Sequence, residues 1–184
     1  MATRITFSNQ EKDLAKAWSW YNDQKIALKS YRAEIINAAR TSMPVQQKLK
    51  GLAPAELQQY FKENEIELEH LCSLDMVAAT EALLRIDFYK KVYKKKKSVI
   101  AKSFRQLYKE KKDRISLEKD IIRVWQSMAA ERKHDFSALI GLLKYRHWLA
   151  HGRYWKPKLE REYNAQISYH IARKVADFVK TQHD

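Results

Sequence analysis

The sequence predicts an all-α protein, an antiparallel helical bundle with an additional N-terminal helix. Its 184 residues include only three glycines and three prolines, too few for the many turns of a β-sheet protein. Apolar residues recur at three- and four-residue spacings in several long segments, as they do on the buried face of a helix. A chain of this length can bury roughly 70% of the surface that it exposes when unfolded. We therefore expect one domain over residues 1–184.

The N-terminal region is predicted to form one long helix. Ser8 followed by Glu11 fits a capping box, and the helical pattern continues to about Arg40. This helix lies within residues 1–43. Pro54 then suits the first turn of a short helix that continues through Phe61.

Further helices of the bundle are predicted in the remaining residues. Ser116 is placed to cap one of its helices, and Gly152 and Pro157 separate the last two. The expected helices cover residues 65–93, 99–112, 116–128, 136–150 and 163–179.

Positive charge is concentrated in the middle of the chain. The formal net charge is +14, and residues 85–114 hold thirteen basic and three acidic side chains. Such a one-sided density predicts a surface that binds RNA phosphates without sequence preference, and a solvated lysine face is the alternative. The nearby aromatic residues are expected to pack inside the protein rather than stack on bases. The candidate RNA-binding residues are Lys90, Lys91, Lys94, Lys95, Lys96 and Lys97.

Several classes of protein are excluded by composition. Glycines are too scarce for a phosphate-binding loop or a dinucleotide-binding turn, which argues against nucleoside triphosphatases and Rossmann enzymes. The single cysteine, Cys72, has no intrachain disulfide partner, and the first residues lack the apolar run of a secretory signal. No segment has the ~18 consecutive apolar residues of a membrane-spanning helix. We expect a cytoplasmic protein that has no membrane partner and needs no cofactor.

One segment carries candidate catalytic chemistry, the string Arg146-His147-Trp148-Leu149-Ala150-His151. Arg146 falls inside the apolar stripe of its helix, so it needs a carboxylate, a phosphate or a solvated cleft. His147 and His151 are four residues apart and share a helix face, whereas Arg146 and His151 are rotated by about 140°. Arginine and histidine suffice to cleave phosphodiesters without a metal ion. Imidazoles four apart can also chelate zinc, but the acid of a His-Glu-x-x-His motif is missing.

Other roles are open for the neighbouring residues. Arg146 alone could be the ion-pair partner of Glu81 or Asp87. Glu81 and Arg85, four apart on a helix, fit either a surface pair or a support for the site. The three aromatic residues near the motif are interpreted as packing or dimer contacts; they are Trp148, Tyr154 and Trp155.

The string Arg146-His147-x-x-x-His151 resembles the defining motif of HEPN domains, small all-α modules of prokaryotic toxin and defence systems. Residues 79–85, with Glu81 and Arg85, also resemble a helix that precedes the motif helix in such domains. The resemblance covers residues 65–179 and implies a HEPN-like core there, with the N-terminal helix within residues 1–43 as an addition to it. It also implies a metal-independent endoribonuclease that is a homodimer with one composite cleft. It implies Arg146, His147 and His151 as catalytic residues.

The resemblance also implies a reaction and partners. Attack by the ribose 2′-hydroxyl would leave a 2′,3′-cyclic phosphate and a 5′-hydroxyl. Some HEPN toxins are paired with a nucleotidyltransferase antitoxin that modifies a tyrosine after the motif histidine. Tyr154 lies three residues after His151, one further than the usual spacing. The alternatives are a catalytically silent module that binds nucleic acid or nucleotides, and a structural helical adaptor.

Overall fold

The computed structural model describes residues 5–41, 46, 49–94 and 97–182. Within these residues the chain forms six α-helices, three short helical turns and no strand, so the predicted all-α class is confirmed. The helices are α1 (Leu14–Arg40), α2 (Pro54–Tyr93), α3 (Val99–Lys111), α4 (Ile122–Met128), α5 (Lys133–Ala150) and α6 (Ala165–Thr181).

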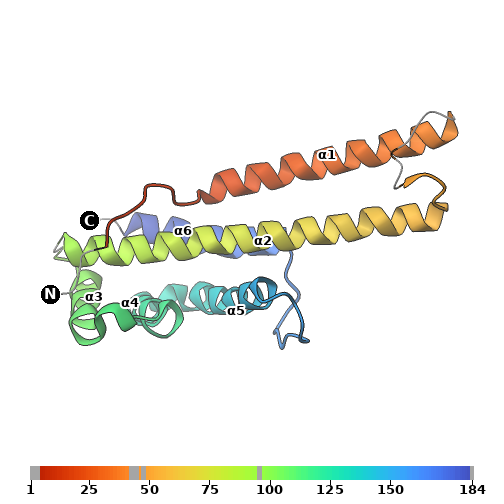
Figure 1. Ribbon diagram of the computed structural model, residues 1–184. Coiled ribbons are helices and arrows are strands. Elements are labelled where there is room, and N and C mark those ends of the chain that lie inside the picture. Colours follow the sequence, from red (N-terminus) through yellow and green to blue (C-terminus); the bar gives the residue numbers. More distant parts are fainter. Residues whose placement is uncertain (1–4, 42–45, 47–48, 95–96, 183–184) are drawn as a thin grey trace.

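Helix α2 has 40 residues, and the other helices are arranged along it (Figure 1). Helices α5 and α6 lie along its C-terminal half, and α3 and α4 close the bundle near its C-terminal end. Helix α1 packs against α2 and α6. The C-terminal part of α1 and the N-terminal part of α2 project beyond the other helices as a two-helix arm, residues 28–40 and 54–64 (Figure 1). In the described chain, no helix combines the length and the apolar character needed to cross a bilayer.

The buried apolar residues form three clusters. One small cluster joins α1, α2 and α6, and another joins Ile35 and Phe61 of the arm to Leu49, which lies between the two helices of the arm in the sequence. In the largest cluster the Trp125 ring stacks on Phe136, with 5.9 Å between ring centroids. This cluster joins helices α2, α3, α4, α5 and α6. Its large side chains include Leu84, Phe88, Phe104, Trp125, Phe136 and Leu142.

Helix α1 begins later than the sequence predicts. Its N-cap is Asp13, whose carboxylate accepts a hydrogen bond of 2.8 Å from the amide of Lys16. The Ser8 hydroxyl instead accepts a hydrogen bond from the amide of Gln10, in a local turn. The predicted capping box at Ser8 is therefore wrong, because an aspartate five residues later satisfies the free amides of the first helical turn.

Helix α2 is continuous, whereas the sequence predicts two helices and a core that begins at residue 65. Its start is predicted correctly, since Pro54 is the first helical residue and the Glu56 carboxylate accepts from the amide of Ala53 at 2.7 Å. No helix-breaking residue lies between Phe61 and Glu65. Residue 65 is therefore an interior position of a helix.

Glu69 of α2 connects three helices through its two carboxylate oxygens. One oxygen accepts a hydrogen bond from the hydroxyl of Tyr21 in α1. The other accepts from the amide of Ala165, the first residue of α6, at 2.6 Å. Burial, and then the hydrogen bond to Glu69, hold the pKa of the Tyr21 hydroxyl above its usual range. Glu69 thus fixes the start of α6 and the place where α1 crosses the bundle.

Replacing Glu69 with alanine is expected to lower the free energy of unfolding by about 1.5–3 kcal/mol, the range for hydrogen bonds to a charged group. The physical reason is that the buried amide of Ala165 and the buried Tyr21 hydroxyl would both lose their acceptor. Urea titration followed by circular dichroism measures the change. Glu63→Ala is the matched control, because the Glu63 carboxylate is exposed and, within the described part of the chain, accepts only from Gln59 of its own helix. Equal losses in both variants would contradict the role of Glu69.

Candidate active site

The predicted motif lies in the last turn of α5 and at its C-terminus. His151 is the C-cap residue, and Gly152 follows with a φ of +78°. The amides of Gly152 and Arg153 donate to the carbonyl oxygens of Leu149 and Trp148 at 3.3 and 3.2 Å. This pattern is a Schellman motif, which needs a left-handed residue directly after the C-cap. The predicted helix end at Gly152 is confirmed, and its geometry fixes the backbone at His151.

The connector between α5 and α6, residues 151–164, is tied to both α5 and α2. The indole Nε1 of Trp148 donates to the carbonyl oxygen of Trp155 at 2.7 Å. Arg153 donates to the carboxylate of Glu67 at 2.7 Å and contacts Nδ1 of His70. Burial, followed by the Arg153 charge, lowers the pKa of His70, which favours the neutral ring that accepts this contact. His70 therefore helps to hold the connector.

Tyr163 anchors the far end of the connector. Its ring stacks on Tyr145 of α5 with 5.1 Å between centroids. Its hydroxyl lies against Gly141, where an added Cβ would be 2.3 Å from the oxygen. A glycine at this position therefore allows the connector to approach α5 closely.

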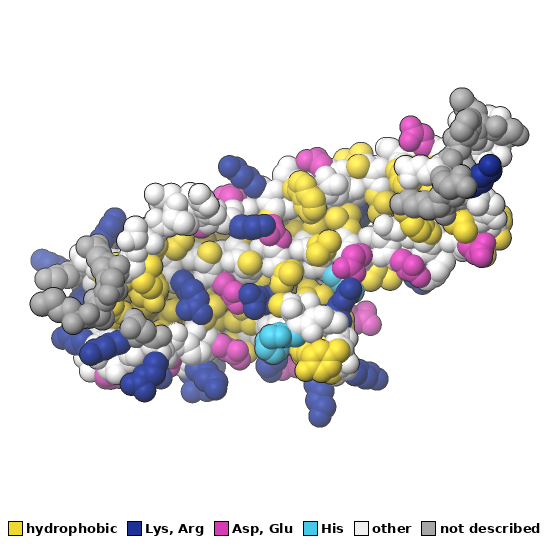
Figure 2. Space-filling view, viewed as in Figure 1, with side chains coloured by type: hydrophobic (Ala, Val, Ile, Leu, Met, Phe, Trp, Pro, Cys, Tyr) yellow, Lys and Arg dark blue, Asp and Glu magenta, His cyan; other side chains and the backbone are white. Residues whose placement is uncertain are grey.

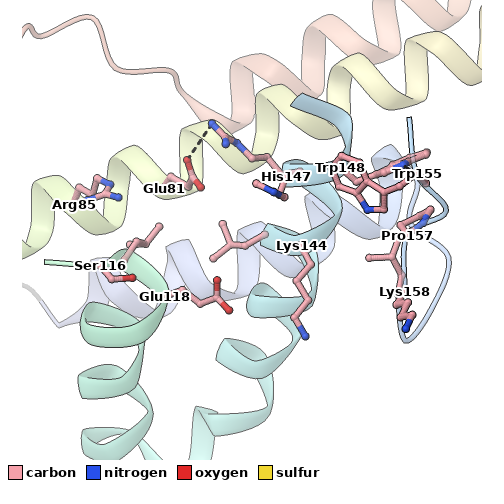
Figure 3. Close-up of a pocket in the computed structure, with 14 residues that line it drawn as sticks. Glu81, Arg85, Ser116, Glu118, Lys144, His147, Trp148, Trp155, Pro157 and Lys158 are labelled. Carbon is pink, nitrogen blue, oxygen red and sulfur yellow. Dashed lines mark hydrogen bonds and ion pairs between the residues drawn. The ribbon is translucent and has the colours of Figure 1, made fainter. Parts of the chain in front are cut away.

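A cleft of about 570 Å³ opens between α2, the start of the π-helical turn Leu117–Ile121, α5 and the connector (Figure 3). This cavity is called the cleft. The charged side chains that line it are four cations and two carboxylates, with His147 beside them; they are Arg85, Lys144, Arg146, Lys158, Glu81 and Glu118. Its other walls include Trp148, Trp155 and Pro157. The excess of cations gives a site that favours an anion.

Arg146 extends from α5 towards α2. Its Nη2 lies 3.7 Å from Oε2 of Glu81, and its side chain is 35% exposed. The dashed line at Glu81 in Figure 3 marks this ion pair. Its Nε is buried and has no hydrogen-bond partner among the described residues. Of the two predicted ion-pair partners, Glu81 is the one that is found, because Asp87 pairs with Lys91. The guanidinium thus lines the cleft with one loose ion pair and donor capacity to spare.

The two histidines lie side by side at the end of α5. The centroids of the His147 and His151 rings are 4.2 Å apart, and both side chains are exposed. The Trp155 ring lies 5.9 Å from His147 and 6.4 Å from His151. His147 lines the cleft, whereas His151 does not. One chain therefore brings the two imidazoles together but leaves Arg146 and His151 on different sides of the helix end. Over the described residues, no group of three or more His, Cys, Asp or Glu side chains is placed to hold a metal ion.

The supporting residues are divided between the cleft and the surface. Arg85 is exposed and lies one turn beyond Glu81 on the cleft side of α2. Tyr154 does not line the cleft; its side chain is 83% exposed, and its ring contacts Trp155 with 4.6 Å between centroids.

The candidate lysines are divided by the structure. Lys90, Lys94 and Lys97 are exposed near the end of α2, where Figure 2 shows basic side chains gathered at one end of the molecule. Lys91 is only 4% exposed; it pairs with Asp87, and its ammonium lies 5.5 Å from the centre of the Trp125 ring. The prediction that Lys91 contacts RNA is therefore wrong, because this side chain is used inside the core. Lys95 and Lys96 lie outside the described residues.

The aromatic residues near these lysines pack together as predicted. Tyr89 and Tyr93 stack with 5.6 Å between centroids, and both contact the ring of Tyr108. All three rings pack against the main apolar cluster.

Asp120 stabilises the π-helical turn that borders the cleft. The Ser116 hydroxyl caps this turn as predicted, by accepting from the amide of Lys119 at 3.2 Å. The Asp120 carboxylate, in a residue that is 7% exposed, accepts from the amide of Ser116 at 2.8 Å and pairs with Lys111. Burial alone would raise the pKa of Asp120, but the hydrogen bonds from Lys111 and Ser116 outweigh it and leave the pKa below its usual range.

Asp120→Asn is expected to lower the melting temperature at pH 7 and to weaken its dependence on acid. Because the folded-state pKa is lowered, the stabilisation by Asp120 is fully present above the unfolded value of about 3.9. It is lost as the pH falls through the folded-state pKa, where the asparagine variant and the wild type should converge. Melting curves between pH 2 and pH 7 test this. Asp177→Asn is the control, since Asp177 forms an exposed ion pair with Arg173. A similar acid response in both variants would exclude a special role for Asp120.

Sequence reasoning missed several residues of the cleft. Lys144 precedes His147 by three residues, so helical spacing could have placed both on one face. Trp155 and Lys158 belong to the irregular connector, where no periodicity indicates which side chains face α5.

Comparison of the chain with protein-family models, with curated proteins and with solved structures finds no match.

Proposed function

We propose that this chain is a metal-independent endoribonuclease of the HEPN type. The observation that carries the proposal is the guanidinium of Arg146 in a cation-rich cleft, with two adjacent imidazoles where its helix ends. A phosphodiester requires cations for its phosphate oxygens, and its transesterification requires one base and one acid. Imidazole supplies both near neutral pH.

The proposed reaction begins with a neutral imidazole that removes the proton of a ribose 2′-hydroxyl. The 2′-oxygen forms a bond to phosphorus as the bond from phosphorus to the 5′-oxygen breaks, and an imidazolium gives its proton to that oxygen. Arg146 holds the phosphate and stabilises its developing charge through paired hydrogen bonds. The products are a 2′,3′-cyclic phosphate and a 5′-hydroxyl end.

The proposal includes a homodimer. Within one chain, Arg146 faces Glu81 across the cleft, and His151 lies outside it. A second copy, related by a two-fold axis, would bring its own histidines to face the first cleft. His151 of each copy would then serve as base or acid, and His147 would orient its neighbour.

A second candidate function is a catalytically silent module that binds nucleic acid or nucleotides. The ion pair between Arg146 and Glu81 favours it, because this carboxylate competes with a substrate phosphate for the guanidinium. In the silent module the cleft and the exposed Lys90, Lys94 and Lys97 bind phosphates, and the histidines have no chemical role.

We further propose a cytoplasmic toxin or defence effector that a partner can control. Its support is Tyr154, which is highly exposed and contacts Trp155 at the edge of the cleft. A nucleotidyltransferase antitoxin that adds a nucleotide to Tyr154 would place negative charge beside the site and oppose RNA binding. Mass spectrometry of protein isolated with its partner tests this, and a modification confined to a peptide without Tyr154 would contradict it.

The ribonuclease proposal is tested by incubating the purified protein with total RNA in EDTA and analysing the fragment ends. Cleavage that leaves cyclic phosphates is expected. A second assay compares an RNA oligonucleotide with its 2′-O-methyl copy as the control. The copy lacks the nucleophile and should stay intact. Retained binding without cleavage of either would support the silent module.

A further inference from the structure

Trp155 differs from the other tryptophan of the cleft in what it contacts. Trp148 uses its indole N–H as a donor to the Trp155 carbonyl, and its ring stacks on Tyr145 with 5.9 Å between centroids. This accounts for Trp148 as a packing residue. The hydrogen bond holds Trp155 through its backbone, so the Trp155 indole itself is not needed to fasten the connector.

The indole of Trp155 lies on the wall of the cleft and is partly exposed (Figure 3). Pro157, two residues further on, lines the same wall and restricts the backbone of the connector. The ring is thus a flat apolar surface on a backbone that is fixed by a hydrogen bond. An aromatic ring that is fixed before binding loses little conformational freedom when a second ring stacks on it.

The surroundings of this ring suit a nucleotide. The cleft is also lined by Lys144, Arg146 and Lys158, and the Trp155 ring is within 6.4 Å of both motif histidines. A volume of about 570 Å³ is within the range of sites that enclose a small organic ligand. A ring for the base and cations for the phosphate therefore share one cavity.

We propose that Trp155 is the stacking platform for an unpaired base beside the bound phosphate, so that the site takes single-stranded RNA. This inference rests on the proposed function, since it places the base relative to the phosphate that would be cleaved. Bases in a duplex are stacked and paired, and they cannot reach a side chain inside a cleft without leaving the helix. Single-stranded RNA presents its bases freely, and every base can stack on an aromatic ring.

The experiment measures affinity by fluorescence anisotropy with two labelled 12-residue probes, oligouridylate and an abasic ribose-phosphate oligomer of the same length. His151→Ala is the parent in this assay, so that neither probe is cleaved. Adding Trp155→Ala is expected to weaken oligouridylate binding roughly 5- to 150-fold, the range for loss of one stacked base, and to leave the abasic probe unchanged. Adding Trp155→Phe should retain most of the affinity. Trp20→Ala is the matched control, because Trp20 is 50% exposed on α1 and does not line the cleft.

Equal weakening of both probes, or no change for either, would overturn the platform. So would a change of oligomeric state in Trp155→Ala, measured by sedimentation, because it would make Trp155 a contact between subunits. The melting temperature of each variant shows whether it is folded. If wild-type protein never cleaves RNA but the Trp155 effect on oligouridylate remains, the ribonuclease proposal fails and the platform stands. If RNA is cleaved and Trp155→Ala has no effect, the platform alone fails.

Discussion

Replacing His151 with alanine is expected to lower the rate of RNA cleavage by about 10²- to 10⁴-fold, the contribution of one positioned acid or base. The affinity for RNA should stay within about twofold, because the cations that line the cleft hold the phosphates and His151 does not line the cleft. Single-turnover cleavage of a labelled RNA oligonucleotide gives the rate, and anisotropy with its 2′-O-methyl copy gives the affinity. Separating the two quantities distinguishes loss of chemistry from loss of binding.

His170→Ala is the matched control for this measurement. His170 is also exposed, but it lies on α6 and does not line the cleft. A rate that is unchanged in His151→Ala would remove this residue from the reaction. A parallel loss of rate and affinity would instead assign His151 to binding.

Arg146→Ala is expected to lower kcat/KM by about 10²- to 10³-fold, as removal of a group that stabilises charge in a transition state does. Arg146→Lys should recover little of this loss, because a single ammonium cannot form the paired hydrogen bonds of a guanidinium. Glu81→Gln should act in the opposite direction on binding. It removes the carboxylate that lies 3.7 Å from Arg146 and competes for it, so the affinity for RNA should rise.

Arg173→Ala provides the control for the loss of an arginine that is paired with a carboxylate. Arg173 pairs with Asp177 on the exposed face of α6, at 3.3 Å, and should not affect cleavage. Full activity in Arg146→Lys would show that any cation suffices at this position. Folding of Arg146→Ala is checked by its melting temperature, since loss of the ion pair would also leave Glu81 without its partner.

Much of the fold follows from local sequence signals, and the errors have local physical causes. The helix end at Gly152 was predictable, because a glycine directly after an apolar helical pattern suits the left-handed position. The start of α1 is not predictable in the same way, because Ser8 and Asp13 are both residue types that cap helices well. Which of them caps α1 depends on where the backbone becomes helical. The neighbouring lysines predict that Lys91 lies on the surface. Its burial depends on Asp87 one turn earlier, a pairing that a count of charges does not detect.

The candidate site was predicted where it lies on one helix and missed where it depends on tertiary contacts. Arg146 and His147 are adjacent in the chain, and both reach the cleft. The sequence leaves two possible ion-pair partners for Arg146, Glu81 and Asp87. It cannot distinguish them, because they lie less than two turns apart on one helix. The sequence predicts Trp155 as a packing or dimer contact. It does not predict that Trp155 lines the cleft, because this position depends on the path of the connector.

The separate apolar cluster of the arm divides the molecule into regions of unequal stability. Ile35, Leu49 and Phe61 bury their side chains against one another and not against the main cluster. Amide hydrogens of the arm can therefore exchange with solvent through a partial opening that leaves the bundle folded. Because α2 belongs to both regions, such an opening frays this helix from its N-terminus and stops where Glu69 joins it to α1 and α6. We therefore expect an opening of the arm to leave the shape of the cleft unchanged.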